Sequence, residues 1–231
     1  MNGLSPHGKI SLAGKVCLVS LVYGFALCPA PSSTDTATPT PTPTPTATAT
    51  SLGSRTIPEL RRALVANVQE QGPYRLTPER RALLNTIRYA EGTWTDGEDK
   101  GYRTLYGGGQ FQDLSRHPER VVVNRYASAA AGAYQFLPTT WKGLARELRL
   151  NSFEPKHQDQ AALHLVKQRG ALKEIDSRGL TTTAMAQLAP EWASFPTRSG
   201  RSVYGQPVKS HQELSSFYAK NLRQLRAQLK T

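Results

Sequence analysis

One carboxylic acid occupies an unusual place in the sequence, at the end of a stretch with a helical pattern of apolar residues. Glu91 follows Leu84 by seven residues and Ile87 by four, and these spacings place the three side chains on one face of a helix. Gly92 comes next, and glycine favours the left-handed conformation that ends many helices. An ionised carboxylate among apolar side chains is costly, so such a group tends to keep its proton. We therefore expect Glu91 to have the raised pKa that a general acid requires.

Two later segments place aromatic rings beside amide or hydroxyl groups, a combination that suits sugars because a sugar ring has apolar faces and polar edges. The first segment contains Tyr134 and Gln135, and the second contains Trp192, Phe195 and, a few residues further on, Tyr204. Each of these patterns alone also fits ordinary core or loop packing. Glu91 alone also fits a solvated residue at a frayed helix end, since most glutamates are exposed.

The elements that must position these residues follow from helix and turn signals. Thr77-Pro78-Glu79 supplies a hydroxyl cap, a proline at the first helical position and an acid in the first turn, which predicts a helix from there to Glu91. Residues 93–133 are rich in glycine, with strand candidates at 102–106 and 121–123. We expect a small β region there and a cleft beside it.

Further helices are predicted in the second half of the chain. Apolar spacing and end signals indicate helices at 138–148, 155–169, 172–175 and 182–188. Ser210 and Glu213 form a capping box that opens a last helix. The order of elements predicts an α+β fold: a mainly helical domain with a small β region after its first helix.

The segments before this domain have a different composition. Residues 1–30 combine a basic start with an apolar run at 16–27, which is short for a membrane span and indicates an export signal peptide or an N-terminal anchor. Cys28 raises a lipoprotein alternative, although Leu27 before it fits that pattern poorly. Residues 31–54 are a Thr/Pro-rich disordered linker. Residues 55–76 are expected to form a lead-in helix, and residues 77–231 the catalytic domain.

The charge and the cysteines limit the partners. The net charge is +12, which favours anionic partners such as a bacterial cell wall, nucleic acid or an anionic membrane surface. We found no basic run or recognition motif typical of nucleic-acid binding, so we expect no nucleic-acid partner. The two cysteines lie at positions 17 and 28, and the five histidines lack metal-ligand spacing. We therefore expect no metal and no cofactor.

Residues 80–222 resemble the bacteriophage lambda lysozyme (endolysin) family of peptidoglycan lytic transglycosylases, which have a lysozyme-like fold. The resemblance covers nearly the whole folded domain and none of residues 1–76. It rests on segments that occur in the family's order: Ala90-Glu91-Gly92-Thr93, Tyr106-Gly107-Gly108, His117-Pro118, Ala131-Gly132-Ala133-Tyr134-Gln135-Phe136, Trp141, Phe153-Glu154-Pro155-Lys156-His157-Gln158-Asp159, Arg169-Gly170-Ala171-Leu172, Ile175-Asp176, Trp192-Ala193-Ser194-Phe195-Pro196 and Tyr204-Gly205-Gln206.

The resemblance implies that Glu91 is the single catalytic acid of an enzyme that cleaves the β-1,4 bond between N-acetylmuramic acid and N-acetylglucosamine. The products of such an enzyme are 1,6-anhydromuramoyl sugars. It further implies that Tyr134 and Gln135 line the cleft and that Tyr204 hydrogen-bonds Glu91 or an N-acetyl group. Trp192 and Phe195 are then sugar platforms or loop-packing residues. We expect a monomer that acts on peptidoglycan in the periplasm, the cell envelope or outside the cell, with membrane attachment only through the N-terminal segment.

Two alternatives to this mechanism stay open from the sequence. A hydrolytic lysozyme would use a second carboxylate, and the β region offers the candidates Asp96, Glu98, Asp99 and Asp113. None of these four is distinguished by its context, so we prefer the mechanism with one carboxylate. A peptidoglycan-binding module without activity is the second alternative, although such a module would not need Glu91. A binder of nucleic acid or membranes would explain the charge but none of these segments.

Overall fold

The computed structural model describes residues 72–124 and 126–229. The predicted signal or anchor at 1–30, the linker at 31–54 and residues 55–71 of the predicted lead-in helix lie outside these residues. Residues 72–76, the end of that predicted helix, have no helical structure. Within the described part, no helix is both long and apolar enough to cross a membrane.

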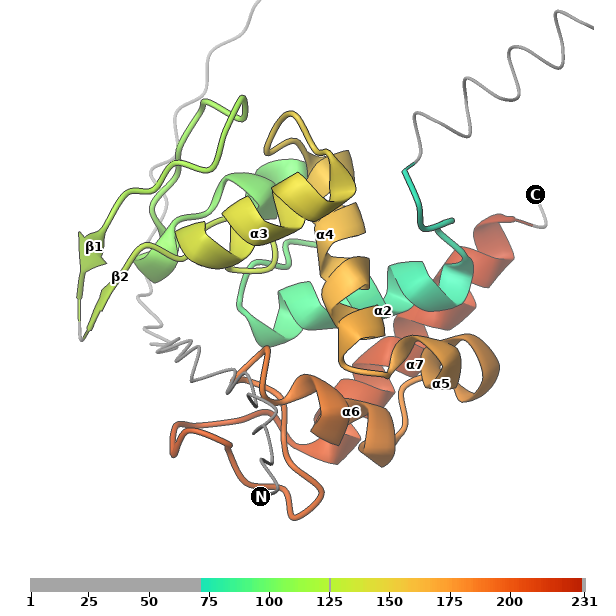
Figure 1. The fold of residues 1–231 in the computed structure, drawn as a ribbon. Coiled ribbons are helices and arrows are strands. Elements are labelled where there is room, and N and C mark those ends of the chain that lie inside the picture. Colours follow the sequence, from blue (N-terminus) through green and yellow to red (C-terminus); the bar gives the residue numbers. More distant parts are fainter. Residues whose placement is uncertain (1–71, 125, 230–231) are drawn as a thin grey trace, which may run out of the picture. The chain divides into compact units, whose positions relative to one another are not determined.

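The first described helix, α2 (Pro78–Ala90), begins and ends as the sequence predicts. The Thr77 side chain accepts a hydrogen bond from the backbone N–H of Arg80, and proline occupies the first turn. Gly92 has a φ of 72°, the left-handed value that glycine adopts at low cost. The apolar face of α2 is fully buried, including Leu84 and Ile87. α2 packs against α4 (Pro155–Gln168), α5 (Leu172–Arg178) and α7 (His211–Gln228), so it is the central helix of the domain (Figure 1).

The β region is smaller than predicted. Only residues 122–123 of the predicted strand at 121–123 pair: β1 (Val122–Val123) lies antiparallel to β2 (Ala127–Ser128). The predicted strand at 102–106 is wrong, because two short 3₁₀ helices, η1 (Asp99–Arg103) and η2 (Tyr106–Gly108), occupy most of it. Single β-bridges join the segment between them to Gln110 and Ala131. Gly107, with a φ of 81°, turns the chain where a strand would have to continue.

The remaining helices match the predictions closely. They are α3 (Pro138–Leu148), α4, α5, α6 (Thr182–Leu188) and α7, and α5 extends three residues beyond the predicted 172–175. The Ser210 side chain caps α7 by accepting from the N–H of Glu213 at 3.0 Å. Phe136, Trp141 and Phe153 pack ring against ring, which fixes α3 against the loops of the β region. The mainly helical α+β fold is confirmed.

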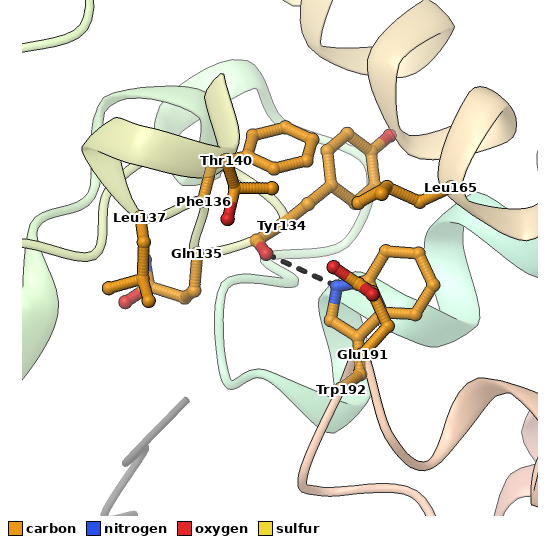
Figure 2. Close-up of a pocket in the computed structure, with 8 residues that line it drawn as sticks. All are labelled: Tyr134, Gln135, Phe136, Leu137, Thr140, Leu165, Glu191 and Trp192. Atoms are coloured by element: carbon orange, nitrogen blue, oxygen red, sulfur yellow. Dashed lines mark hydrogen bonds between the residues drawn. The ribbon is translucent and has the colours of Figure 1, made fainter. Parts of the chain in front are cut away.

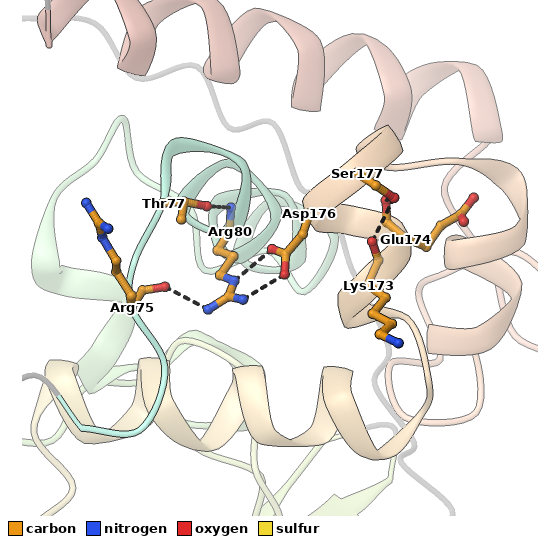
Figure 3. Close-up of polar contacts among 7 residues, drawn as sticks. All are labelled: Arg75, Thr77, Arg80, Lys173, Glu174, Asp176 and Ser177. Carbon is orange, nitrogen blue, oxygen red and sulfur yellow. Dashed lines mark hydrogen bonds and ion pairs between the residues drawn. The ribbon is translucent and has the colours of Figure 1, made fainter.

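Polar contacts tie the start of the domain to its helices. The Tyr74 N–H donates to Gln160 Oε1 at 2.8 Å, and Gln160 Nε2 donates back to the Tyr74 carbonyl at 2.9 Å. Residues before the predicted boundary at 77 therefore pack on α4. Figure 3 shows Arg80 of α2 facing Asp176 of α5, with Nε–Oδ1 and Nη2–Oδ2 distances of 2.8 and 2.7 Å. This two-bond geometry is typical of arginine–carboxylate pairs.

Candidate active site

Glu91 lies at the C-terminal end of α2 with only 4% of its surface exposed. Its Oε1 accepts a hydrogen bond from the Ser194 hydroxyl at 2.5 Å. Its Oε2 is buried and has no hydrogen-bond partner among residues 72–124 and 126–229. Burial raises the pKa of Glu91 to about 7, while the bond from Ser194 acts in the opposite direction. A carboxylic acid in this state can hold its proton near neutral pH and give it to a substrate.

The chain that follows Glu91 is held in one position. The Thr93 N–H donates to the Arg88 carbonyl at 2.9 Å, and the Thr93 hydroxyl donates to the Ala133 carbonyl at 2.6 Å. A Cβ atom on Gly101 would lie 2.1 Å from the Thr93 carbonyl oxygen, so this approach requires glycine. The end of α2 is therefore fixed to the Gly132–Phe136 segment, as a catalytic acid on a rigid element would require.

The segment at 132–136 is a tight turn in an unusual conformation. Gln135 has a φ of 48°, a left-handed value that costs free energy for a residue other than glycine. Its side-chain amide donates to the carbonyls of Gly132 and Thr104 at 2.9 and 3.2 Å. Gln158 of α4 supports the turn, because its Oε1 accepts from the Ala133 N–H at 2.9 Å. Gln135 itself is buried, with 4% of its surface exposed, so the expectation that it lines the cleft stays a prediction.

Tyr134 points into the protein rather than out of it. Its ring is buried, and its hydroxyl donates to Asp159 of α4. Its carbonyl accepts from Trp192 Nε1 at 3.2 Å, as Figure 2 shows. Tyr134, Gln135, Trp192 and Glu191 line a pocket of about 20 Å³, which has room for roughly one water molecule. This pocket is too small for a sugar ring.

The aromatic residues of the later segment are interior or partly interior. Trp192 and Phe195 are buried, so their rings support the loop and present little surface to a ligand. Tyr204 is half-buried, and its hydroxyl donates to the Pro190 carbonyl at 2.8 Å. The hydroxyl that meets Glu91 belongs to Ser194, which lies between Trp192 and Phe195. Ser194 lies 103 residues from Glu91 in the chain, and the helical phase of Glu91 contains no signal for a partner so distant.

A second buried carboxyl group lies behind the turn. Asp159 accepts hydrogen bonds from the hydroxyls of Tyr102, at 2.7 Å, and of Tyr134, and from Arg81 Nη1 at 2.7 Å. Burial and the negative charge of Asp159 raise the pKa of Tyr102 to about 12. Asp159 thus joins α2, η1, α4 and the turn at one point.

The four acids considered as second carboxylates, Asp96, Glu98, Asp99 and Asp113, are all exposed. Asp113 caps its own loop by accepting from the Ser115 N–H at 2.8 Å. Asp96 and Asp99 line a groove of about 670 Å³ to which Glu91 does not contribute. Within residues 72–124 and 126–229, no three histidine, cysteine or acidic side chains are grouped so that they could hold a metal ion.

Comparison with known proteins supplies the context for this geometry. The Endolysin family profile matches residues 81–225. The chain is 39% identical to the endolysin of Escherichia phage lambda over 124 residues, which is 51% of this chain and 77% of that protein. It is 33% identical to the endolysin of Escherichia phage P2 over 147 residues, or 58% of this chain and 86% of that protein.

Solved structures agree with these sequence matches. Bacteriophage lambda lysozyme complexed with a chitohexasaccharide superposes with a TM-score of 0.58 at 34% identity, covering 64% of this chain and 96% of the lysozyme. A second structure of lysozyme from bacteriophage lambda gives a TM-score of 0.54 at 31% identity, covering 66% of this chain and 96% of the lysozyme.

Proposed function

This chain belongs to the endolysin family, and from that premise we propose that it degrades peptidoglycan with Glu91 as its catalytic acid. The observation that supports this role most strongly is the state of Glu91. It is a buried carboxylic acid at the end of a rigid helix, with a pKa raised to about 7 and one oxygen without a partner. The related lambda lysozyme has been solved with a chitohexasaccharide, which makes a β-1,4-linked amino sugar the substrate class to test.

The proposed reaction is a lytic transglycosylation. Protonated Glu91 gives its proton to the glycosidic oxygen as the bond from that oxygen to C1 of N-acetylmuramic acid breaks. The leaving N-acetylglucosamine keeps this proton as a hydroxyl hydrogen. The Glu91 carboxylate then takes the proton of the muramoyl 6-hydroxyl while O6 bonds to C1 and closes the 1,6-anhydro ring. Glu91 is reprotonated, and no water is consumed.

The surroundings of Glu91 support a mechanism with one carboxylate. A retaining glycosidase needs a second carboxyl group about 5 Å away, and an inverting one needs it roughly 6.5–9.5 Å away. A carboxylate that close would raise the pKa of Glu91 by repulsion. Among the described residues the causes of the Glu91 pKa are burial and Ser194, with no acid contributing. Hydrolysis with a water molecule is the alternative, and the nature of the products separates the two.

The aromatic segments serve this site from within. We propose that Tyr134 and Trp192 hold the turn that contains Gln135, and that Phe195 fixes the loop of Ser194. Tyr204 bonds the Pro190 carbonyl, so its role is to shape that loop. Gln135 is buried as well, with 4% of its surface exposed, and its amide bonds the Gly132 and Thr104 carbonyls, so its role is to hold the turn beside Glu91.

The decisive experiment combines product analysis with a variant of Glu91. Purified peptidoglycan is digested, and the muropeptides are weighed by mass spectrometry. We expect products one water lighter than hydrolysis products. The Glu91→Gln variant should lose activity by a factor of about 10²–10⁴, as is typical when a general acid is removed. Glu98→Gln, which changes an exposed acid of the same region, is the matched control and should be fully active.

Each outcome decides a separate point. Reducing-end muramic acid alone would show hydrolysis. Activity of the Glu91→Gln variant within a few-fold of the unchanged protein would remove Glu91 as the acid.

We further propose that residues 1–30 export or anchor the protein and that the Thr/Pro segment at 31–54 extends the domain into the wall. Cleavage of a fusion that carries residues 1–30, or its retention in membranes, tests this assignment.

A further inference from the structure

The two oxygens of Glu91 differ in their surroundings. Oε1 accepts from the Ser194 hydroxyl at 2.5 Å, whereas Oε2 is buried without a partner in the part of the chain that the structure describes. We propose that Ser194 is a positioning residue that fixes the Glu91 carboxyl so that Oε2 is the oxygen that bears the reacting proton. This inference depends on the proposed role of Glu91 as the acid, and it specifies which atom delivers the proton and what orients it.

The argument follows from the hydrogen-bonding capacity of a carboxylic acid. A protonated carboxyl group has one carbonyl oxygen, which accepts, and one hydroxyl oxygen, which donates. An oxygen that accepts a short bond from a serine hydroxyl is the carbonyl oxygen. The proton of Glu91 is therefore on Oε2, which forms no hydrogen bond with any of the described residues. Because Oε2 is shielded from solvent, the site must open before the glycosidic oxygen can reach Oε2 and become its hydrogen-bond partner.

Ser194 is itself held in place on both sides. Its carbonyl accepts from the Lys209 N–H at 3.0 Å, at the approach to α7. The Phe195 N–H closes a turn onto the Trp192 carbonyl at 2.9 Å. Trp192 in turn donates to the Tyr134 carbonyl at 3.2 Å, and Asp159 accepts from the Tyr134 hydroxyl. The hydroxyl of Ser194 is thus positioned by the same turn that is fixed to the end of α2.

The charged side chains of the adjoining segments have partners of their own. Arg88 of α2 donates to the Glu98 carbonyl at 2.6 Å. Glu191, before the Ser194 loop, pairs with Arg169 at 2.6 Å. Lys209 pairs with Glu213 of α7 at 2.7 Å. None of these charges is among the causes of the Glu91 pKa, so the pH at which Glu91 ionises responds to burial and to Ser194.

The test is the pH dependence of peptidoglycan cleavage by variants of Ser194. The bond from Ser194 lowers the pKa of Glu91, so Ser194→Ala should raise it and move the basic limb of the pH profile upward by about one unit, as expected for one hydrogen bond to a charged group. The rate at the optimum should fall by roughly tenfold, since the proton loses its orientation. Ser194→Thr, which keeps the hydroxyl, should restore the original limb. Ser194→Cys supplies a weaker donor, so its basic limb should lie at a pH between those of the unchanged protein and the Ser194→Ala variant.

The controls separate this inference from the proposed function. His211 lies at the start of α7, and its replacement by asparagine is a control that should leave the limb in place. A limb that coincides for Ser194→Ala and the unchanged protein would overturn the role of Ser194 while leaving Glu91 intact. An inactive unchanged protein would overturn both proposals. Melting temperatures of all variants show whether a loss of rate reflects unfolding, and a shifted limb among folded molecules supports the inference even when the rate falls.

Discussion

Glu91 and Asp159 are two carboxyl groups that the fold buries to the same degree, with 4% and 3% of their surfaces exposed. Asp159 meets three donors, including the guanidinium of Arg81 at 2.7 Å. Among the described residues, Glu91 meets one donor, Ser194, and its second oxygen has none. Burial alone therefore does not distinguish a reactive acid from a structural one. The number and charge of the hydrogen-bond partners distinguish the two, because donors occupy the lone pairs of the carboxyl and a cation stabilises its ionised form.

The comparison assigns the two groups opposite roles. A carboxyl group that accepts from three donors, as Asp159 does, stabilises the native arrangement. A buried carboxyl with an oxygen that none of the described residues bonds, as in Glu91, is poorly stabilised by the fold. We therefore expect changes at Asp159 to lower stability and changes at Glu91 to lower activity while stability is kept or improved.

The largest effect on folding should come from Asp159→Ala. It would leave the hydroxyls of Tyr102 and Tyr134 buried without an acceptor and Arg81 without its counter-charge. Breaking a buried ion pair in this way costs about 3–5 kcal/mol of unfolding free energy. Urea denaturation followed by circular dichroism measures this loss.

Tyr134→Phe is the matched control for that variant, because it removes one donor and keeps the ring. It should cost about 1–2 kcal/mol, the usual value for one hydrogen bond to a charged group. Equal stability of the Asp159→Ala variant and the unchanged protein would show that the network around Asp159 contributes nothing.

A smaller and opposite effect is expected for the stability of the Glu91→Gln variant. The pKa of Glu91 is about 7 in the folded protein and 4.5 in the reference state. The folded state therefore binds the proton more tightly, and its stability falls as the pH rises from about 4.5 to 7. The full cost above pH 7 is about 3 kcal/mol, and the amide of glutamine escapes it. Thermal unfolding at pH 4 and pH 8 should show nearly equal stability at pH 4 and a more stable variant at pH 8.

Glu98→Gln again serves as the control, since it makes the same chemical change at an exposed position. A Glu91→Gln variant that is less stable than the unchanged protein at pH 8 would mean that the folded state stabilises the ionised form, contrary to the comparison with Asp159.

The smallest effect should come from Asp176→Asn, which breaks the ion pair with Arg80 between α2 and α5. The side chain of Asp176 is 36% exposed, so water replaces much of what is lost, and the cost should be under about 1 kcal/mol. The activity and its pH profile should not change. A loss as large as that of Asp159→Ala would show that two hydrogen bonds outweigh burial at this site. The melting temperatures of the Asp176→Asn variant and the unchanged protein at low and high salt measure this loss of stability.

Local sequence signals were sufficient to predict most of the helices. Thr77 and Ser210 cap helices because their hydroxyls accept hydrogen bonds from backbone N–H groups three residues further on, and that geometry depends on sequence neighbours alone. The position of Glu91 on the buried face of α2 follows from helical phase in the same way. The strand at 102–106 was predicted wrongly because β pairing depends on a partner strand, and here Gly101 and Gly107 accommodate close packing and a turn.

The sequence by itself determined where α2 ends, which of its faces is buried and that one acid lies on that face. Only the tertiary structure decided that Ser194, 103 residues away in the chain, is the partner of that acid. It also decided that Asp159 and not Glu91 receives the three donors, and that the rings of Tyr134 and Trp192 face inward. The physical reason is the distance along the chain over which each effect acts. Capping and periodicity act within a few residues, whereas the partners of a buried carboxyl are chosen by the packing of helices and loops from across the whole domain.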